Sequence, residues 1–327
     1  MKPFWWNRQR PKQLQPPNNA LLPILPYTQL LTDSTRSILI LPKVGCNIDE
    51  LTLETIPISV LGTRLHARGK HIALPPVESV TIGHTISIQA RKIKSRPVVP
   101  LQIVTMFKHE TDVAILRFIE YYRGVGVERF ILYYNDTPSS RSFEHLQSES
   151  VEILYFPCPY KNPLFDPARV ERNCFNFAQE FVLAFAAYEH FPQAQYTLLI
   201  DLDEFIAPLP DSDGQIQIRN LLPELEGYDS IRFSNVWCKH VPEGILMAQQ
   251  SDKDYRFKHA YSQRVRGIPG PHGLYEDWTA DTRIKHSEWN MMQFIDHDTA
   301  DRDQHHMSND VREAELRERN PSVVTYA

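Results

Sequence analysis

The chain has 327 residues, of which 42% are hydrophobic, and it carries a formal net charge of −5 at pH 7. This length and composition suffice for one large globular domain with an appendage. The acidic balance argues against a general nucleic-acid binder, which would present a strongly basic face. No stretch approaches the roughly 20 apolar residues that a membrane-spanning helix needs.

Residues 1–35 are rich in Pro, Gln and Asn and show no periodicity, so the sequence predicts a disordered tail. The tail lacks an apolar core long enough for a signal peptide. The four cysteines of the chain are widely spaced and form no C-x-x-C pair, which is compatible with a reducing compartment. We therefore expect a soluble cytoplasmic protein. The alternative is a peripheral one, in which Trp5 and Trp6 touch a membrane surface.

Residues 36–98 contain short runs that are typical of β-strands, at 38–41, 56–61 and 80–90. In the last run apolar side chains alternate on both sides of Gly83, as in half-buried strands. The sequence predicts a small β-rich N-terminal appendage here. Residues 91–100 combine basic residues with two prolines and indicate a linker, so the main domain is expected to span 99–327.

Strand and helix patterns alternate in the first part of this domain. Such alternation implies right-handed crossovers and an α/β fold with a mostly parallel sheet flanked by helices. A further helix, within 166–190, has an aromatic stripe that we expect to pack on the sheet. The predicted elements are a strand at 101–107, a helix at 111–123, a strand at 130–134, a helix at 139–147 and a strand at 151–156.

The stretch 196–208 is the centre of the functional prediction. A mostly apolar run predicts a buried strand, and it leads directly into Asp201, Asp203 and Glu204. Ligands of open α/β sheets bind at the carboxyl ends of strands, and two acids at i and i+2 can share one hard divalent cation. The alternative is that the aspartates only cap a helix or form a turn before Pro208.

Other charged residues follow the two earlier strands of the domain. Lys108 and Glu110 come after the first strand, and Asp136 comes after the second. If the strands are parallel, these residues share an edge with Asp201. Taken alone, Asp136 is equally well explained as a turn residue before Pro138.

The later part of the chain predicts one more strand, at 229–237, and then glycine- and proline-rich loops at 239–275 that could close over a substrate. Seven of the thirteen histidines follow residue 239. His297, then His305 and His306, are candidates to complete a metal site. Their spacing matches no standard zinc motif, so for any one of them a solvated acidic loop without a metal is the favoured explanation. No glycine-rich phosphate-binding fingerprint is present, so a metal is the natural means of neutralising a diphosphate.

The second half of the sequence resembles GT-A-fold glycosyltransferases, most closely family 92 and its family 2 relatives. The matching segments follow one another in the same order over residues 101–210. They are Lys108-His-Glu110, the helix Phe118-Ile-Glu-Tyr-Tyr-Arg-Gly-Val-Gly-Val127, Phe130-Ile-Leu-Tyr-Tyr-Asn-Asp136, and Asp201-Leu-Asp-Glu-Phe205 with Pro208. After Trp237 the sequence departs from the family pattern, and Arg283 to His297 match it only loosely.

The resemblance implies a GT-A-like domain that transfers a hexose-like sugar from a nucleotide-sugar donor to a hydroxyl of a glycan or related acceptor. Asp201 and Asp203, with His297, would hold a manganese or magnesium ion on the donor diphosphate. The first-strand residues and Asp136 would face the nucleoside. The transfer also needs a carboxylate that removes the acceptor proton, and Asp277 is the candidate by its order along the chain, after the flexible loops. A surface turn explains Asp277 equally well.

Two other functions are compatible with the sequence. One is a non-catalytic nucleotide- or carbohydrate-binding protein with a transferase fold. The other is a metal-dependent phosphohydrolase in which one of the two aspartates is the nucleophile, although that class usually carries its D-x-D on the first strand.

Overall fold

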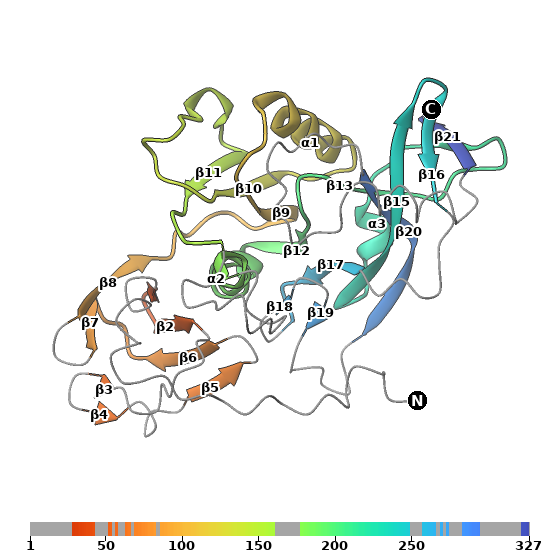
Figure 1. Cartoon of the computed structure of the whole chain (residues 1–327). Coiled ribbons are helices and arrows are strands. Elements are labelled where there is room, and N and C mark those ends of the chain that lie inside the picture. The colour runs from red at the N-terminus through yellow and green to blue at the C-terminus, as the bar shows by residue number, and fades with distance from the viewer. Residues whose placement is uncertain are drawn as a thin grey trace, which may run out of the picture. The chain divides into compact units, whose positions relative to one another are not determined.

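The computed structural model describes two compact units of the chain (Figure 1). The first consists of Met1–Ile93 and Lys161–Phe177, and the second of Lys94–Tyr160 and Ala178–Ala327. Within these units, the described residues are 28–42, 52–53, 56–57, 63–66, 69–82, 86–160, 177–248, 257–265, 269–270, 273–274, 283–294 and 322–326.

The first unit is built on a sheet in the strand order β4-β3-β7-β8-β1-β2-β6-β5. Strand β1 begins inside the segment predicted to be a tail, because Leu30 and Leu31 are buried and their strand pairs with both β2 and β8. The eight strands are β1 (Gln29–Thr32), β2 (Ser37–Pro42), β3 (Thr52–Leu53), β4 (Ile56–Pro57), β5 (Thr63–His66), β6 (Gly69–Leu74), β7 (Ser79–Ile82) and β8 (Ile86–Lys92).

The second unit contains a larger sheet, and one side of it has the predicted parallel order. Here β11 (Val151–Tyr155), β10 (Arg129–Tyr134), β9 (Val99–Phe107) and β12 (Ala194–Leu199) lie side by side and all run in the same direction. All six residues of β10 are buried, as expected for a strand covered on both faces. The carboxyl ends of the four strands therefore meet at one edge.

The other side of this sheet corrects the sequence prediction. β17 is antiparallel to both β12 and β15, whereas β15 and β20 are parallel, so the whole sheet is mixed rather than mostly parallel. Part of the segment predicted to be loops, 239–275, forms strands. The remaining strands are β13 (Glu204–Ala207), β14 (Gln215–Ile216), β15 (Ser230–Val241), β16 (Gly244–Met247), β17 (Phe257–Ser262), β18 (Pro269–Gly270), β19 (Gly273–Leu274), β20 (Ile284–Phe294) and β21 (Ser322–Tyr326).

Helix α1 (Asp112–Gly124) matches the sequence prediction closely. Thr111 caps it by accepting a hydrogen bond from the Ala114 N–H at 3.1 Å. Beyond its end, Gly126 has φ of 97°, and a Cβ placed there would lie 2.6 Å from Asn220 Oδ1. The positive φ favours glycine at this position, and the contact with the Asn220 side chain adds to the cost of a larger residue.

The two longer helices, α1 and α2, pack on opposite faces of the parallel strands. Side chains alternate along β10, so Phe130 joins the core that includes α1, whereas Tyr133 contacts Phe185 of α2 (Phe177–Phe185). Phe181 and Phe185 pack against Phe156, which confirms the expected structural role of the aromatic stripe. None of the helices in the described ranges is long and apolar enough to cross a membrane.

The predicted helix at 139–147 is wrong. Only Glu144–Leu146 forms a short 3-10 turn. Ser140 explains part of the difference, because its hydroxyl donates to the Thr137 carbonyl oxygen at 2.6 Å. Such local hydrogen bonds compete with those of a helix. Another short helix, α3 (Leu222–Leu225), precedes β15.

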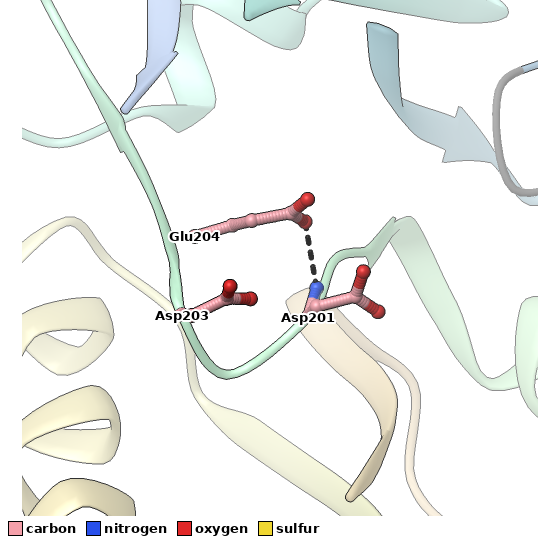
Figure 2. A group of neighbouring side chains, drawn as sticks. All are labelled: Asp201, Asp203 and Glu204. Carbon is pink, nitrogen blue, oxygen red and sulfur yellow. Dashed lines mark hydrogen bonds between the residues drawn. The ribbon is translucent and has the colours of Figure 1, made fainter. Parts of the chain in front are cut away.

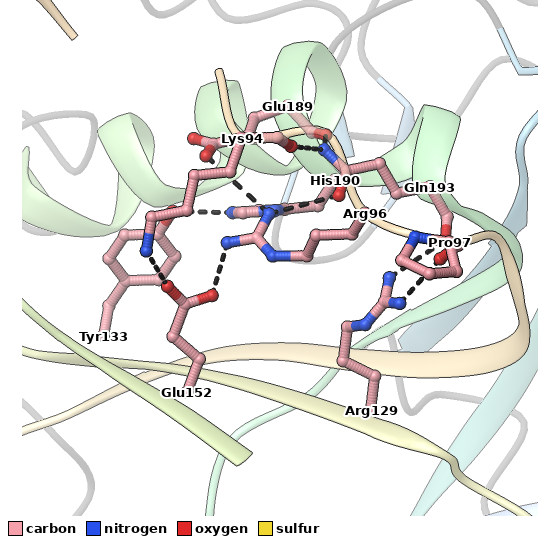
Figure 3. A network of polar contacts seen from close by, with 9 residues as sticks. All are labelled: Lys94, Arg96, Pro97, Arg129, Tyr133, Glu152, Glu189, His190 and Gln193. Atoms are coloured by element: carbon pink, nitrogen blue, oxygen red, sulfur yellow. Dashed lines mark hydrogen bonds and ion pairs between the residues drawn. The ribbon is translucent and has the colours of Figure 1, made fainter. Parts of the chain in front are cut away.

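A polar network holds the amino-terminal edge of the parallel strands (Figure 3). Lys94 and Arg96, which precede β9, both pair with Glu152 of β11. Arg129 donates to the Gln193 carbonyl oxygen at 3.1 Å. The network links the chain entering β9 to β10, β11 and the turn before β12, so we assign it a structural role.

Candidate active site

The three acids of the sequence motif form a tight turn between β12 and β13. The Glu204 side chain reaches back across the turn, and its Oε2 accepts a hydrogen bond from the Asp201 N–H at 2.8 Å (Figure 2). In the reverse direction, the Glu204 N–H donates to the Asp201 carbonyl oxygen at 3.1 Å. Leu202, between the two aspartates, is buried in the core. The motif is thus held by its own backbone and by packing.

Two tyrosines of α1 fix the strand that leaves this turn. The buried Tyr122 hydroxyl donates to the Glu204 carbonyl oxygen at 3.0 Å and accepts from the Ile206 N–H at 2.9 Å. The Tyr121 hydroxyl donates to the Ile206 carbonyl oxygen at 2.8 Å. Both rings also contact Phe205. Helix α1 therefore positions the backbone on which the acids stand.

The acidic cluster has the chemistry of a site for a hard cation. One carboxylate oxygen each from Asp201, Asp203 and Glu204 can be chosen so that all lie within 4.8 Å of one another. Asp201 and Asp203 are partly exposed, whereas Glu204 is buried. Oxygen ligands of this kind suit magnesium, manganese or calcium. These residues could therefore hold a metal ion.

A buried lysine lies inside the same cluster. Lys258 Nζ donates to Asp201 Oδ2 at 2.7 Å and lies 3.0 Å from Glu204 Oε2. Leu199 of β12 is paired with His259, so Lys258, the adjacent residue of β17, comes opposite the start of the acidic turn. Its side chain is only 4% exposed. One cation of the protein itself thus already neutralises part of the cluster.

The electrostatics of the cluster follow from burial and close charges. Burial raises the pKa of Glu204 above its ordinary value, the charge of Lys258 opposes that rise, and the neighbouring Asp201 and Asp203 add to it. Burial lowers the pKa of Lys258, but the charges of Asp201 and Glu204 outweigh burial and raise it above its ordinary value. Lys258 therefore stays protonated at neutral pH.

Asp203 faces a second strand of the sheet. Gln293 of β20 places its Nε2 3.4 Å from Asp203 Oδ2, and Asn235 of β15 places its Nδ2 3.4 Å from Gln293 Oε1. Sequence reasoning did not single out Lys258, Gln293 or Asn235. The one available signal was a lysine between Phe257 and the pair Ala260 and Tyr261 in β17.

The other predicted residues divide into two groups. Lys108 and Glu110 follow β9, and Asp136 follows β10, so the parallel strands bring them to the edge where Asp201 follows β12. Lys108 is exposed and Glu110 buried, and Asp136 Oδ1 accepts from the Thr137 N–H at 2.8 Å, as in a turn. The second group, Asp277, His297, His305 and His306, lies outside the described residues.

Comparison of the sequence with models of known protein families identifies the family of this chain. The model of glycosyltransferase family 92 matches residues 103–313, well over half of the chain. The chain belongs to glycosyltransferase family 92. This confirms the resemblance seen in the sequence. The family 92 region begins within β9 and continues past β20, so it contains the acidic turn, Lys258 and Gln293, and leaves out the β-rich first strands.

No curated protein matches the family 92 chain. Among solved structures, HddC from Yersinia pseudotuberculosis is 10% identical, with 60% of this chain and 93% of that chain covered and a TM-score of 0.29. Rv0371c from Mycobacterium tuberculosis H37Rv is 10% identical, with 61% and 90% covered and a TM-score of 0.27. Its complex with manganese is 12% identical, with 68% and 99% covered and a TM-score of 0.28. TM-scores this low do not establish a shared fold.

Proposed function

We propose that this family 92 glycosyltransferase is metal-dependent, has a GT-A-like catalytic domain and moves a hexose-like sugar from a nucleotide-sugar donor to a hydroxyl of a glycan or related acceptor. The observation that carries the proposal is the position of Asp201 and Asp203. They form the turn at the carboxyl end of β12, beside the parallel strand β9, within the region that matches the family. This edge is the ligand-binding edge of open α/β sheets.

The acidic turn suits the divalent cation that such a reaction uses. Asp201 and Asp203 are the residues that would hold manganese or magnesium, because they offer partly exposed carboxylates at i and i+2. When bound, the ion would neutralise the donor diphosphate and stabilise it as the leaving group. The reciprocal hydrogen bonds of the turn and the Tyr122 contacts keep the two carboxylates in place before any ligand binds.

The remaining predicted residues complete the proposal. Lys108, Glu110 and Asp136 would bind the nucleoside, because they share the edge of the sheet with Asp201. Asp277 would remove the proton from the acceptor hydroxyl, and His297 would complete the metal site. The phosphohydrolase alternative is disfavoured, since β12 is the fourth strand of its unit, whereas that class usually carries its D-x-D on the first strand.

The test is binding of UDP and GDP to the purified full chain, each with and without manganese, measured by isothermal titration calorimetry. We expect one nucleotide to bind in a manganese-dependent manner and this binding to be lost in Asp203→Asn. The control is Asp213→Asn, which removes an exposed carboxylate from another turn. Nucleotide binding that depends neither on manganese nor on Asp203 would disprove the proposed site.

Sugar transfer is tested separately, with radiolabelled nucleotide sugars as donors. Release of free sugar or its transfer to an added glycan, lost in Asp203→Asn, supports the enzyme. Manganese-dependent binding without any turnover would instead indicate the non-catalytic binding protein.

A further inference from the structure

Lys258 lies beside the proposed metal site, and its role as inferred below rests on that site. Lys258 is not part of the D-x-D motif and comes from a different strand, β17. Its ammonium group is nonetheless among the acids, within 3.0 Å of oxygens of both Asp201 and Glu204. A lysine that is 4% exposed and directly paired with a candidate metal ligand affects how that ligand can bind an ion.

The charges of the cluster show what this effect is. Asp201, Asp203 and Glu204 carry three negative charges when ionised, and Lys258 carries one positive charge. Two negative charges therefore remain, which would be balanced by one divalent cation. The Lys258 ammonium group is also paired with Asp201 Oδ2 and Glu204 Oε2. A metal ion that binds here therefore competes with the ammonium group for these oxygens and is repelled by its charge. Both effects are strongest on the buried side of the cluster, beside Lys258 and Glu204.

We propose that Lys258 is a built-in counter-cation that keeps the affinity of the acidic turn for a divalent metal low until a nucleoside diphosphate supplies further negative charge and oxygen ligands. Metal and nucleotide then bind as a unit. The coupling is reciprocal, because a metal ion that binds tightly only with the nucleotide must strengthen nucleotide binding by the same factor. Lys258 acts through Asp201 and Glu204, so it is a positioning residue.

A purely structural role for Lys258 makes a different prediction. If it only neutralises the buried Glu204, then replacing both residues by neutral ones of similar size removes the pair without changing the affinity for metal. If it opposes the metal, removing its charge tightens metal binding even where Glu204 is already neutral. The two roles are therefore separated by comparing variants that share Glu204→Gln.

The experiment measures manganese binding to the full chain by electron paramagnetic resonance, which counts free Mn²⁺ and does not depend on activity. The key pair is Glu204→Gln and Glu204→Gln/Lys258→Met. Neither of them leaves an unpaired buried glutamate, the condition that could prevent Lys258→Met alone from folding. Without nucleotide, the double variant should bind Mn²⁺ about ten-fold more tightly, or more, than Glu204→Gln.

Adding UDP or GDP completes the test. The nucleotide should tighten Mn²⁺ binding strongly in the wild type, and by a factor about ten-fold smaller in the double variant than in Glu204→Gln. Equal Mn²⁺ affinities in the two variants, with binding still lost in Asp203→Asn, would overturn the role of Lys258 and leave the proposed metal site intact. No Mn²⁺ binding in any protein, with or without nucleotide, would overturn both.

Discussion

Tyr122→Phe is the substitution that tests whether α1 supports the acidic turn. It removes one hydroxyl and leaves the ring, which stacks with Phe205, in place. The hydroxyl bridges two backbone groups of β13, the Glu204 carbonyl and the Ile206 N–H. Tyr121→Phe is the matched control on the same helix, because it removes a partly buried hydroxyl that donates to the Ile206 carbonyl.

The expected loss follows from the number and burial of these hydrogen bonds. Tyr122 is fully buried, and each buried backbone group that loses its partner costs about 1–3 kcal/mol. Two such groups make the free energy of unfolding fall by about 2–6 kcal/mol. Tyr121 is only partly buried, so its hydrogen bond to the Ile206 carbonyl should contribute about 0.5–1.5 kcal/mol.

Urea unfolding, followed by tryptophan fluorescence, measures both losses. Trp237 and Trp289 are buried in the same unit as the acidic turn and report on its unfolding. We expect the midpoint to fall more in Tyr122→Phe than in Tyr121→Phe, with the slope unchanged. The affinity for manganese should also fall in Tyr122→Phe. If Tyr122→Phe is no more destabilising than Tyr121→Phe, the turn does not depend on the bridging hydroxyl, and the positioning role of α1 is refuted.

Two further predictions concern stability elsewhere in this unit. Burial favours the neutral form of Glu152, but the hydrogen bond from Lys94 and the charge and hydrogen bond of Arg96 outweigh it and hold its pKa below the ordinary value. The wild type should therefore be more stable than Glu152→Gln by a constant free energy near neutral pH, and this difference should shrink as the pH falls below about 4.3. Urea unfolding at several pH values measures the difference. A difference that grows in acid would contradict the prediction. Gly126→Ala should lower the melting temperature, because alanine there combines a strained positive φ with a clash against an asparagine side chain, at a cost of about 1–3 kcal/mol. Differential scanning calorimetry measures the shift, and Gly124→Ala, whose added methyl group meets only an ordinary contact, is the control that should change little.

The sequence predicted the parallel part of the fold because the signals for those elements are local. Apolar runs bounded by turns marked β9, β10, β11 and β12, and the apolar spacing with Thr111 before it marked α1. The acids at the end of β12 could be recognised for the same reason. Their position depends only on where an apolar strand stops.

The antiparallel part of the sheet was less visible in the sequence. β17 contains Lys258 and His259 and so lacks a clean apolar pattern, and it lies in a segment rich in glycine and proline. It becomes a central strand because β12 and β15 pair with it from both sides. Such pairings join residues far apart in the chain, and no local pattern encodes them.

The sequence by itself therefore determined which strand delivers Asp201 and Asp203 and to which family the chain is similar. Only the tertiary structure decided what surrounds these acids. Lys258 is 57 positions from Asp201 along the chain, yet their side chains are 2.7 Å apart. A lysine stays charged when buried only where opposite charges compensate the loss of water, and here those charges come from another part of the chain. Its role thus depends on long-range strand pairing, which composition and spacing do not specify.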